Sequence, residues 1–426
     1  MNTWFIVAVV VLLAFLGAPL FTLIGGIALY AFGSQGIDTS SVIIDLYRIA
    51  ETPTLIAIPL FTFAGYLLAE SKSPQRLVAL ARAIFGWIPG GLAIVVLATC
   101  AFFTAFTGAS GVTIVALGGI LYPILIRESY PEQFSLGLVT ASGSIGLLFP
   151  PSLPIIMYGI IAEVSIDQMF VAGIIPGFLL VGFIALYSMR IGVKARVPTV
   201  RFSWSNLLTA LKGAAWEIPL PFIIVGGIYG GAFTATEASA VTAFYVLIVV
   251  AFIYRDMSIT MDVPRVMKES MILVGAILAI LGTALGLTNY LIDEQVPQQL
   301  FEFVQANVES RFAFLLILNL FLLIVGMMMD IFSAIIVVVP LILPIARAFN
   351  IDPLHLGIIF LTNLEIGYLT PPVGLNLFLS GLRFEKPILE IAHSVLVFIA
   401  LLLTALMIIT YFPELSLWLV RFFGTQ

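Results

Sequence analysis

The same short motif occurs twice in this chain, each time inside a strongly apolar stretch. Ile-Gly-x-Leu-x-Pro-Pro runs from Ile145 to Pro151 and again from Ile366 to Pro372, and 366 minus 145 gives an offset of 221 residues. The same offset maps Pro123 onto Pro344. The chain is therefore an internal duplication, and each copy places glycine and two prolines, residues that interrupt helices, within an apolar segment.

Composition indicates where such a chain folds. Hydrophobic residues make up 61% of the 426 residues and charged residues 10%, against roughly half and a quarter in soluble domains. Because about twenty apolar residues cross a bilayer as a helix, the chain has room for about a dozen spans. Interrupted backbone at membrane depth is tolerated only where it is buried in protein or lines a polar cavity. Paired interruptions in two halves indicate a transporter's binding site.

The apolar segments predict an all-α polytopic membrane protein with two matching halves. Six segments in each half match in order, near 3–16, 19–33, 53–70, 88–126, 135–162 and 169–189, then 214–231, 236–254, 268–291, 312–346, 355–382 and 390–411. The fourth of each half is too long for one span and predicts a re-entrant helical hairpin, and the fifth predicts a broken helix. The first segment lacks the basic leader of a signal peptide, so we expect a retained helix.

These segments divide the chain into two repeats and a connector. The first repeat is predicted to cover residues 1–193 and the second 214–426, while 194–213 forms an amphipathic connector on the cytoplasmic surface. With the amino terminus outside, 14 of the 18 Lys and Arg residues fall on the cytoplasmic side, as loops near span ends prefer. The two hairpins then open from opposite sides. This predicts inverted repeats and a periplasmic amino terminus.

Other protein classes fit the sequence poorly. Cys100 is the only cysteine, which excludes an intrachain disulfide and a cysteine metal cluster. The two histidines, His355 and His393, are too far apart for a helical zinc motif, so an intramembrane hydrolase is disfavoured and the chain is not expected to be an enzyme. The net charge of −5 forms no basic stripe for nucleic acid. The expected partners are membrane proteins, lipid, ions and small solutes.

The first hairpin and the first crossover are rich in glycine and hydroxyl groups. The hairpin tip reads Thr-Gly-Ala-Ser-Gly-Val-Thr over residues 107–113, and the crossover reads Ser-Gly-Ser-Ile-Gly over 142–146. Glycine lets the backbone leave the helix, and the freed carbonyls together with the hydroxyl oxygens suit a hard monovalent cation such as Na⁺. Small residues also allow close helix packing. The pairing with a Pro-Pro crossover favours the cation site.

The second hairpin carries a carboxylate at its tip. Asp330 follows three methionines there, and an ionised group at membrane depth costs roughly 3 kcal/mol on insertion scales, so it needs a partner. A cation is the simplest partner, and a helix cap is the alternative. Glu365, in the second crossover, is assigned a structural role ahead of proton coupling. Glu217 and Glu237 lie near segment ends, where we expect them to be solvated.

A half-helix follows each Pro-Pro pair. The two begin at Ser152 and Val373, and Asn376 lies one turn into the second. Free N–H groups at such helix starts attract anions without a buried Arg or Lys, although proline also favours helix starts for purely conformational reasons. We expect the solute to be an anion, and its candidate contacts are Thr107, Ser152, Asn363 and Asn376.

These residues together resemble the large membrane subunit of the tripartite ATP-independent periplasmic (TRAP) transporters. The resemblance covers essentially the whole chain and is most specific over 107–119, 141–154, 326–344 and 363–378. It implies the fold of ion-transporter-superfamily carriers, which move a transport domain against a scaffold in an elevator motion. It also implies two sodium sites, one at Gly108, Ser110, Ser142 and Gly146, the other at Gly326, Asp330, Gly367 and Thr370. Where family members often have serine, this chain has Ala109, so only backbone can coordinate there.

The resemblance further implies a function and partners. A Na⁺-coupled secondary transporter in the bacterial inner membrane would import a C4-dicarboxylate, sialic acid or similar carboxylate, with two or more Na⁺ as coupling ions and no organic cofactor. A periplasmic substrate-binding protein would deliver the solute, and a small subunit of four membrane helices would complete the complex. The alternative is a stand-alone Na⁺/carboxylate symporter of the same superfamily. A channel is a third possibility, and saturable uptake that stops without Na⁺ would count against it.

Overall fold

The described part of the chain is built from helices. A computed structural model describes residues 18–424 except 41, 45, 46, 48–51, 200 and 309, together with 9, 10, 12, 13 and 16, and these residues contain helices but no strands. Most of the predicted first segment, 3–16, lies outside the described residues. Eight of the described helices are long and apolar enough to cross a membrane, and a bent pair, Glu132–Leu148 with Leu153–Ile161, adds a broken one with a bend of 44°.

The first half of the chain, predicted as the first repeat, contains one hairpin and one broken helix. Its elements are α2 (Leu20–Ser34), η1 (Pro53–Ile56), α4 (Ala57–Glu70), α5 (Ser73–Phe85), α6 (Gly91–Thr107), α7 (Ser110–Arg127), α8 (Glu132–Ser142), η2 (Ile145–Leu148), α9 (Leu153–Ile161) and α10 (Ile166–Lys194). Helices α6 and α7 form the hairpin that residues 88–126 predict. Helix α11 (Trp204–Gly213) lies within the predicted connector and has no buried residue.

The second repeat has the corresponding elements. They are α12 to α13 (Pro219–Tyr229), α14 with η4 (Ala235–Ile253), α15 (Asp262–Asp293), α16 (Val296–Asn307), α17 (Arg311–Met328), α18 (Ile331–Ala348), α19 (Pro353–Gly367), α20 (Leu375–Phe384), α21 (Ile388–Tyr411) and α22 (Glu414–Gly424). Adding 221 to the bounds of α7 gives 331 and 348, the bounds of α18. Both Pro-Pro bonds, Pro150–Pro151 and Pro371–Pro372, are cis. Helix breaks thus recur at the offset of the sequence repeat.

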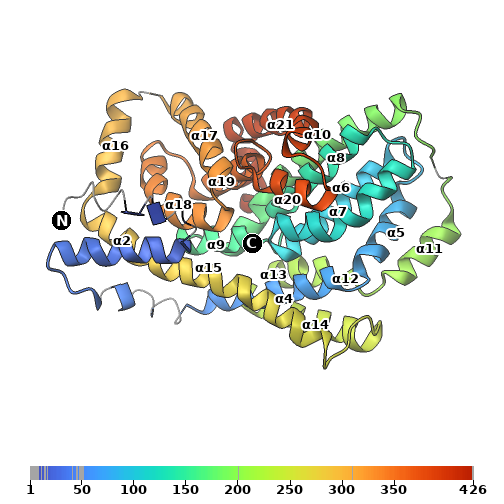
Figure 1. Ribbon diagram of the computed structural model, residues 1–426, viewed down its shortest axis with the longest axis horizontal. Helices are drawn as coiled ribbons and strands as arrows, with labels where there is room; N and C mark the ends of the chain where they lie inside the picture. Colours follow the sequence, from blue (N-terminus) through green and yellow to red (C-terminus); the bar gives the residue numbers. More distant parts are fainter. Residues whose placement is uncertain are drawn as a thin grey trace.

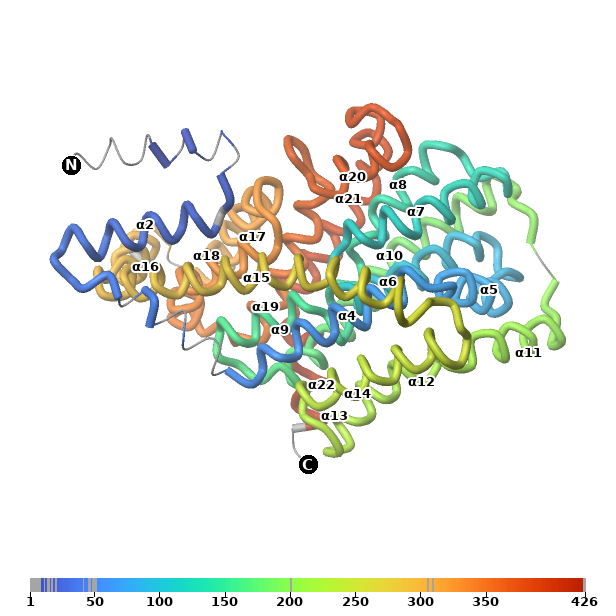
Figure 2. Tube along the Cα trace, turned by 60° about the horizontal axis from the view of Figure 1, so that its bottom comes forward, coloured from blue at the N-terminus to red at the C-terminus, as the bar shows by residue number. Residues whose placement is uncertain are grey.

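The helices form two groups that lie side by side. Helices α2, α4, α14 and α15 pack along one side of the molecule, and α15 runs along most of its length (Figure 1). The two hairpins lie at opposite ends of the other group, with α9, α19, α20 and α21 between them, as the rotated view also shows (Figure 2). This arrangement places both Pro-Pro crossovers in the middle of the molecule.

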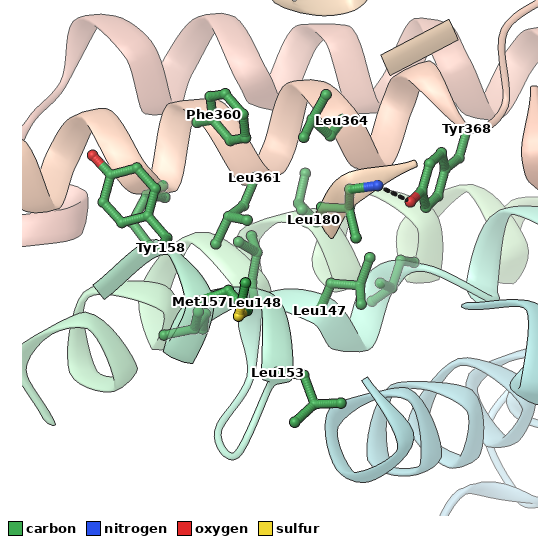
Figure 3. Close-up of a cluster of buried hydrophobic side chains, with 14 of the residues drawn as sticks. Leu147, Leu148, Leu153, Met157, Tyr158, Leu180, Phe360, Leu361, Leu364 and Tyr368 are labelled. Atoms are coloured by element: carbon green, nitrogen blue, oxygen red, sulfur yellow. Dashed lines mark hydrogen bonds between the residues drawn. The ribbon is translucent and has the colours of Figure 1, made fainter. Parts of the chain in front are cut away.

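A buried apolar core joins the two crossovers. Leu147 and Leu148 of η2 face the side of α19 that carries Leu361 (Figure 3), and all three side chains are at most 1% exposed. The ring of Tyr158 lies 6.2 Å from that of Phe360, and its hydroxyl donates to the Pro353 carbonyl at 2.7 Å. Close packing of this kind holds the crossovers in fixed positions relative to each other.

Candidate transport site

The tip of the first hairpin turns at a glycine that no other residue replaces without strain. Gly108 has φ +64°, in the left-handed region, and a Cβ added there would lie 2.5 Å from Cγ of Leu153. Leu153 is the first residue of α9, directly after Ser152. The tip is therefore pressed against the start of the first half-helix, where the anion is predicted to bind.

The first crossover lies against the same hairpin. A Cβ added to Gly146 would lie 2.3 Å from the Ala101 carbonyl oxygen of α6, so crossover and hairpin touch backbone to backbone. Thr104 Oγ1 donates to the Gly143 carbonyl at 2.8 Å and hydrogen-bonds the Thr113 hydroxyl at 2.8 Å. The bonds of Thr104 thus connect α6, α7 and α8. We did not predict Thr104, whose only signal is a hydroxyl one turn before the tip of an apolar helix.

Several hydroxyl oxygens in this region find no partner within the described residues. The Oγ atoms of Ser110, Ser144 and Ser152 are buried and unbonded, whereas Ser142 Oγ donates to the Leu138 carbonyl at 2.5 Å. Thr107 Oγ1 makes one long bond, 3.4 Å, to the Ala109 carbonyl. A buried polar atom without a partner costs about 1–3 kcal/mol. Unbonded hydroxyls grouped at one tip and one crossover are suited to bind an ion or a polar solute.

The second hairpin meets the second crossover through glycine as well. A Cβ on Gly367 would lie 2.5 Å from the backbone carbon of Gly326, so α17 and α19 are in contact there. Tyr368 and Gly374 add hydrogen bonds across the same junction: the Ile331 N–H donates to the Tyr368 hydroxyl, and the Gly374 N–H donates to the Met327 carbonyl at 3.3 Å. The hairpin tip is thus tied to both sides of the Pro-Pro break.

Asp330 caps helix α18. Its Oδ1 accepts from the N–H groups of Phe332 at 3.0 Å and Ser333 at 3.1 Å, and its Oδ2 accepts from the Ser333 hydroxyl. These bonds satisfy free donors at the helix start. The side chain is exposed. Thr370, assigned to the same site, instead donates its hydroxyl to the Ile366 carbonyl at 2.9 Å.

Three polar residues near the second crossover are fully buried. Asn376 donates to the Thr140 carbonyl of α8 at 3.4 Å while its Oδ1 finds no partner among the described residues. Asn363 donates to Asn319 Oδ1 at 2.7 Å. Neither carboxylate oxygen of Glu365 has a partner in the part of the chain that the structure describes, although the residue is 1% exposed. Asn376 connects the second half-helix to the first crossover.

The prediction for Glu217 was wrong. We expected it to be solvated at a segment end, but its side chain is fully buried and forms an ion pair with Arg76 Nη1 at 2.9 Å. It also accepts from the hydroxyls of Ser73 at 2.9 Å and Tyr254 at 3.0 Å. Burial raises the pKa of Tyr254 to about 12, so this phenol stays protonated and able to donate near neutral pH. Glu237, by contrast, is exposed as predicted and completes a capping box on α14.

Comparison with known proteins identifies the family. The model of the tripartite ATP-independent periplasmic transporter DctM component matches residues 5–415. The chain belongs to this family. A C4-dicarboxylate TRAP transporter large permease protein of Pseudomonas aeruginosa is 37% identical over 94% of this chain and 93% of its own length. That of Rhodobacter capsulatus is 32% identical over the full length of both. The chain is thus a TRAP transporter permease subunit, as the resemblance implies, and not an enzyme.

Two further relatives bear on architecture. The isethionate TRAP transporter permease protein DctMQ of Oleidesulfovibrio alaskensis is 35% identical over 91% of this chain, which spans 61% of that protein. The crystal structure of the YdaH transporter of Alcanivorax borkumensis has the same fold, with a TM-score of 0.62 over 89% of this chain and 87% of that one at 13% identity. The predicted all-α polytopic membrane fold is confirmed.

Proposed function

We propose that this subunit imports an organic acid anion driven by Na⁺, by moving the group of helices that contains both hairpins against the group formed by α2, α4, α14 and α15. The observation that carries the proposal is the clustering of buried, unbonded oxygens at the first tip and crossover, together with a carboxylate at the second tip. Oxygen ligands from carbonyls, hydroxyls and carboxylates suit Na⁺. The periplasmic amino terminus, the inverted repeats and the inner-membrane location belong to the same proposal.

The first sodium site would lie between the first hairpin tip and the first crossover. Ser110 would supply its unbonded Oγ, and Gly108, Ser142 and Gly146 would supply backbone carbonyls. At the second site Asp330 would ligate the ion while capping α18, because a carboxylate has more lone pairs than its three hydrogen bonds use. Gly326, Gly367 and Thr370 would contribute carbonyl oxygens.

The anion would bind between the two half-helix starts. Ser152 offers a buried, unbonded hydroxyl before α9, and Thr107 a weakly bonded one at the neighbouring tip. Asn376 follows the start of α20, where free N–H groups favour negative charge. The names of the Pseudomonas and Rhodobacter relatives favour a C4-dicarboxylate. Among other relatives, one is named for isethionate and one from Halomonas elongata for ectoine.

A small membrane subunit and a periplasmic substrate-binding protein would complete the transporter. The isethionate relative's combined DctMQ name and greater length support a membrane partner. The second candidate is a stand-alone symporter, which would need neither of these partners. The two candidates differ in what transport requires.

Reconstitution distinguishes the candidates. Uptake of labelled succinate into proteoliposomes is measured with the permease alone, with the co-encoded small subunit, and with the binding protein added, in NaCl and in choline chloride of equal ionic strength. We expect uptake only with all three components and Na⁺. Uptake by the permease alone would support the stand-alone symporter, and uptake unaffected by choline would contradict Na⁺ coupling. A thermal-shift screen of the binding protein against organic acids selects the solute if succinate is not bound.

A further inference from the structure

A chain of buried polar side chains runs through the second repeat beside the candidate site. His355 contacts the Ser416 hydroxyl and the Thr410 carbonyl, each at 3.2 Å. Asn319 Nδ2 donates to Thr410 Oγ1 at 3.1 Å, and Asn319 Oδ1 accepts from Asn363 Nδ2 at 2.7 Å. All five residues are at most 1% exposed. The chain connects α17, α19, α21 and α22 and ends at Asn363.

The duplication does not account for this polar chain. Subtracting 221 from 319, 355, 363 and 410 gives the first-repeat residues Ala98, Phe134, Ser142 and Met189. Three of these four are apolar, and Ser142 donates to a carbonyl of its own helix. Burying polar side chains is unfavourable unless they are bonded. The polar chain therefore reflects a role that is specific to the second repeat.

Hydrogen bonding leaves Asn363 with one free group, its carbonyl oxygen. Its Nδ2 donates to Asn319 Oδ1 at 2.7 Å and to the Ile359 carbonyl at 2.8 Å, which uses both hydrogens. Rotating the amide by 180° would place Oδ1 against those two oxygens, so the orientation is determined. Oδ1 is buried and finds no partner among the described residues. A free acceptor attracts a cation and repels a carboxylate. Contact between Asn363 and a substrate carboxylate is therefore disfavoured.

Asn363 lies about one helical turn before the glycine contact of the second candidate site. Asn363 lies four residues before Gly367 and Asn319 seven before Gly326, so each pair shares one face of its helix. Gly326 and Gly367 are in backbone contact. The contact between α17 and α19 thus leads from the Asn319–Asn363 bond directly to the glycines of the site.

We propose that Asn363 Oδ1 is a further Na⁺ ligand at the α17–α19 contact and that Asn319 is the positioning residue that aims it. The inference rests on the proposed Na⁺ coupling and extends it. Glu365 is not part of this ligand set, because two residues along a helix turn its side chain about 200° away from Asn363. Asn319 acts only through Asn363, by holding both amide hydrogens away from the ion.

Na⁺-dependent thermal stabilisation of the purified full-length permease tests the inference without transport. The melting temperature is measured over an NaCl series with choline chloride keeping ionic strength constant, because a ligand that binds only the folded state stabilises it by RT ln(1 + [L]/Kd), so the series yields the Kd for Na⁺. Asn363→Ser is the main variant, since serine occupies the equivalent position 142 and folds there. We expect its Na⁺ midpoint, the fitted concentration at which the site is half occupied, to rise about tenfold. Asn319→Ala should raise it by a similar factor.

Ser416→Ala is the matched control at the far end of the same polar chain. It removes the hydroxyl next to His355 but leaves the Asn363 amide in place, so its Na⁺ midpoint should equal that of the wild type. An unchanged midpoint in Asn363→Ser would overturn the inference and leave a packing role. A wild-type protein that Na⁺ does not stabilise more than choline would contradict the proposed Na⁺ coupling itself. If Asn363→Ser does not fold, Asn319→Ala decides by the same measurement.

Discussion

The two hairpin tips occupy equivalent positions but differ in chemistry. Ala109 occupies the N-cap position of α7 and Asp330 that of α18, and 330 minus 109 is again 221. The first tip turns through Gly108 at φ +64° and is largely buried, whereas the second passes through Met329 at φ −123° and exposes Asp330. The helix breaks recur at this offset, whereas the polar groups at the two tips differ. One tip offers neutral oxygens and the other a charge.

Removing the charge from the second tip should have the largest effect. Asp330→Asn keeps a side chain that caps helices well, so α18 should remain intact. It removes the negative charge that would ligate Na⁺ at the second site. Loss of one charged interaction of about 3 kcal/mol corresponds to about a hundredfold weaker Na⁺ binding. Na⁺-dependent uptake in the complete reconstituted transporter should fall to background.

Asp330→Ala separates the contribution of helix capping from the contribution of the charge. This variant should lose uptake as well and in addition about 1 kcal/mol of stability, the usual worth of an N-cap. Thermal unfolding of both variants in choline measures that difference. Normal uptake by Asp330→Asn at low Na⁺ would show that Asp330 only caps the helix and that the two tips differ less than their sequences indicate.

The turn of the first tip should be the next most sensitive feature. Gly108→Ala forces a side chain into the left-handed region and toward Leu153, which together cost about 1–3 kcal/mol. We expect a lower melting temperature and reduced uptake. Met329→Ala, at the equivalent position in extended backbone, serves as the control and should leave uptake nearly normal. Equal losses in both variants would mean that the two tips depend on their turns in the same way.

The backbone breaks were predictable because glycine and adjacent prolines mark them locally. The outer ends of the pairs α6–α7 and α17–α18 lie within three residues of the predicted hairpin bounds, 88–126 and 312–346. Helices α5 and α16 were not predicted, because they contain too many polar residues to stand out as apolar segments. Segment 214–231 was predicted as one helix and contains short elements with a π-helical turn.

Long-range polar partners could not be predicted. Glu217 is buried because Arg76, 141 residues earlier, lies beside it, and a charge near a segment end gives no sign of such a partner. The same holds for Asn319 and Asn363, which are 44 residues apart and meet only because Gly326 and Gly367 let α17 and α19 touch. Local residues indicate where a helix breaks, whereas packing decides which polar atoms become paired.

The smallest effect should come from a single hydroxyl of the first tip. Ser110→Ala removes one buried, unbonded Oγ but leaves the proposed carbonyl ligands, so we expect the half-saturating Na⁺ concentration for uptake to rise only about threefold, the effect of a weak neutral ligand. Ser188→Ala is the matched control: its Oγ in α10 is also buried and unbonded among the described residues, but the adjacent Met189 packs against Gly90 at the base of the hairpin rather than at its tip. Its Na⁺ dependence should equal that of the wild type. If both serine variants behave alike, Ser110 is a packing residue, and the neutral site must consist of backbone carbonyls alone.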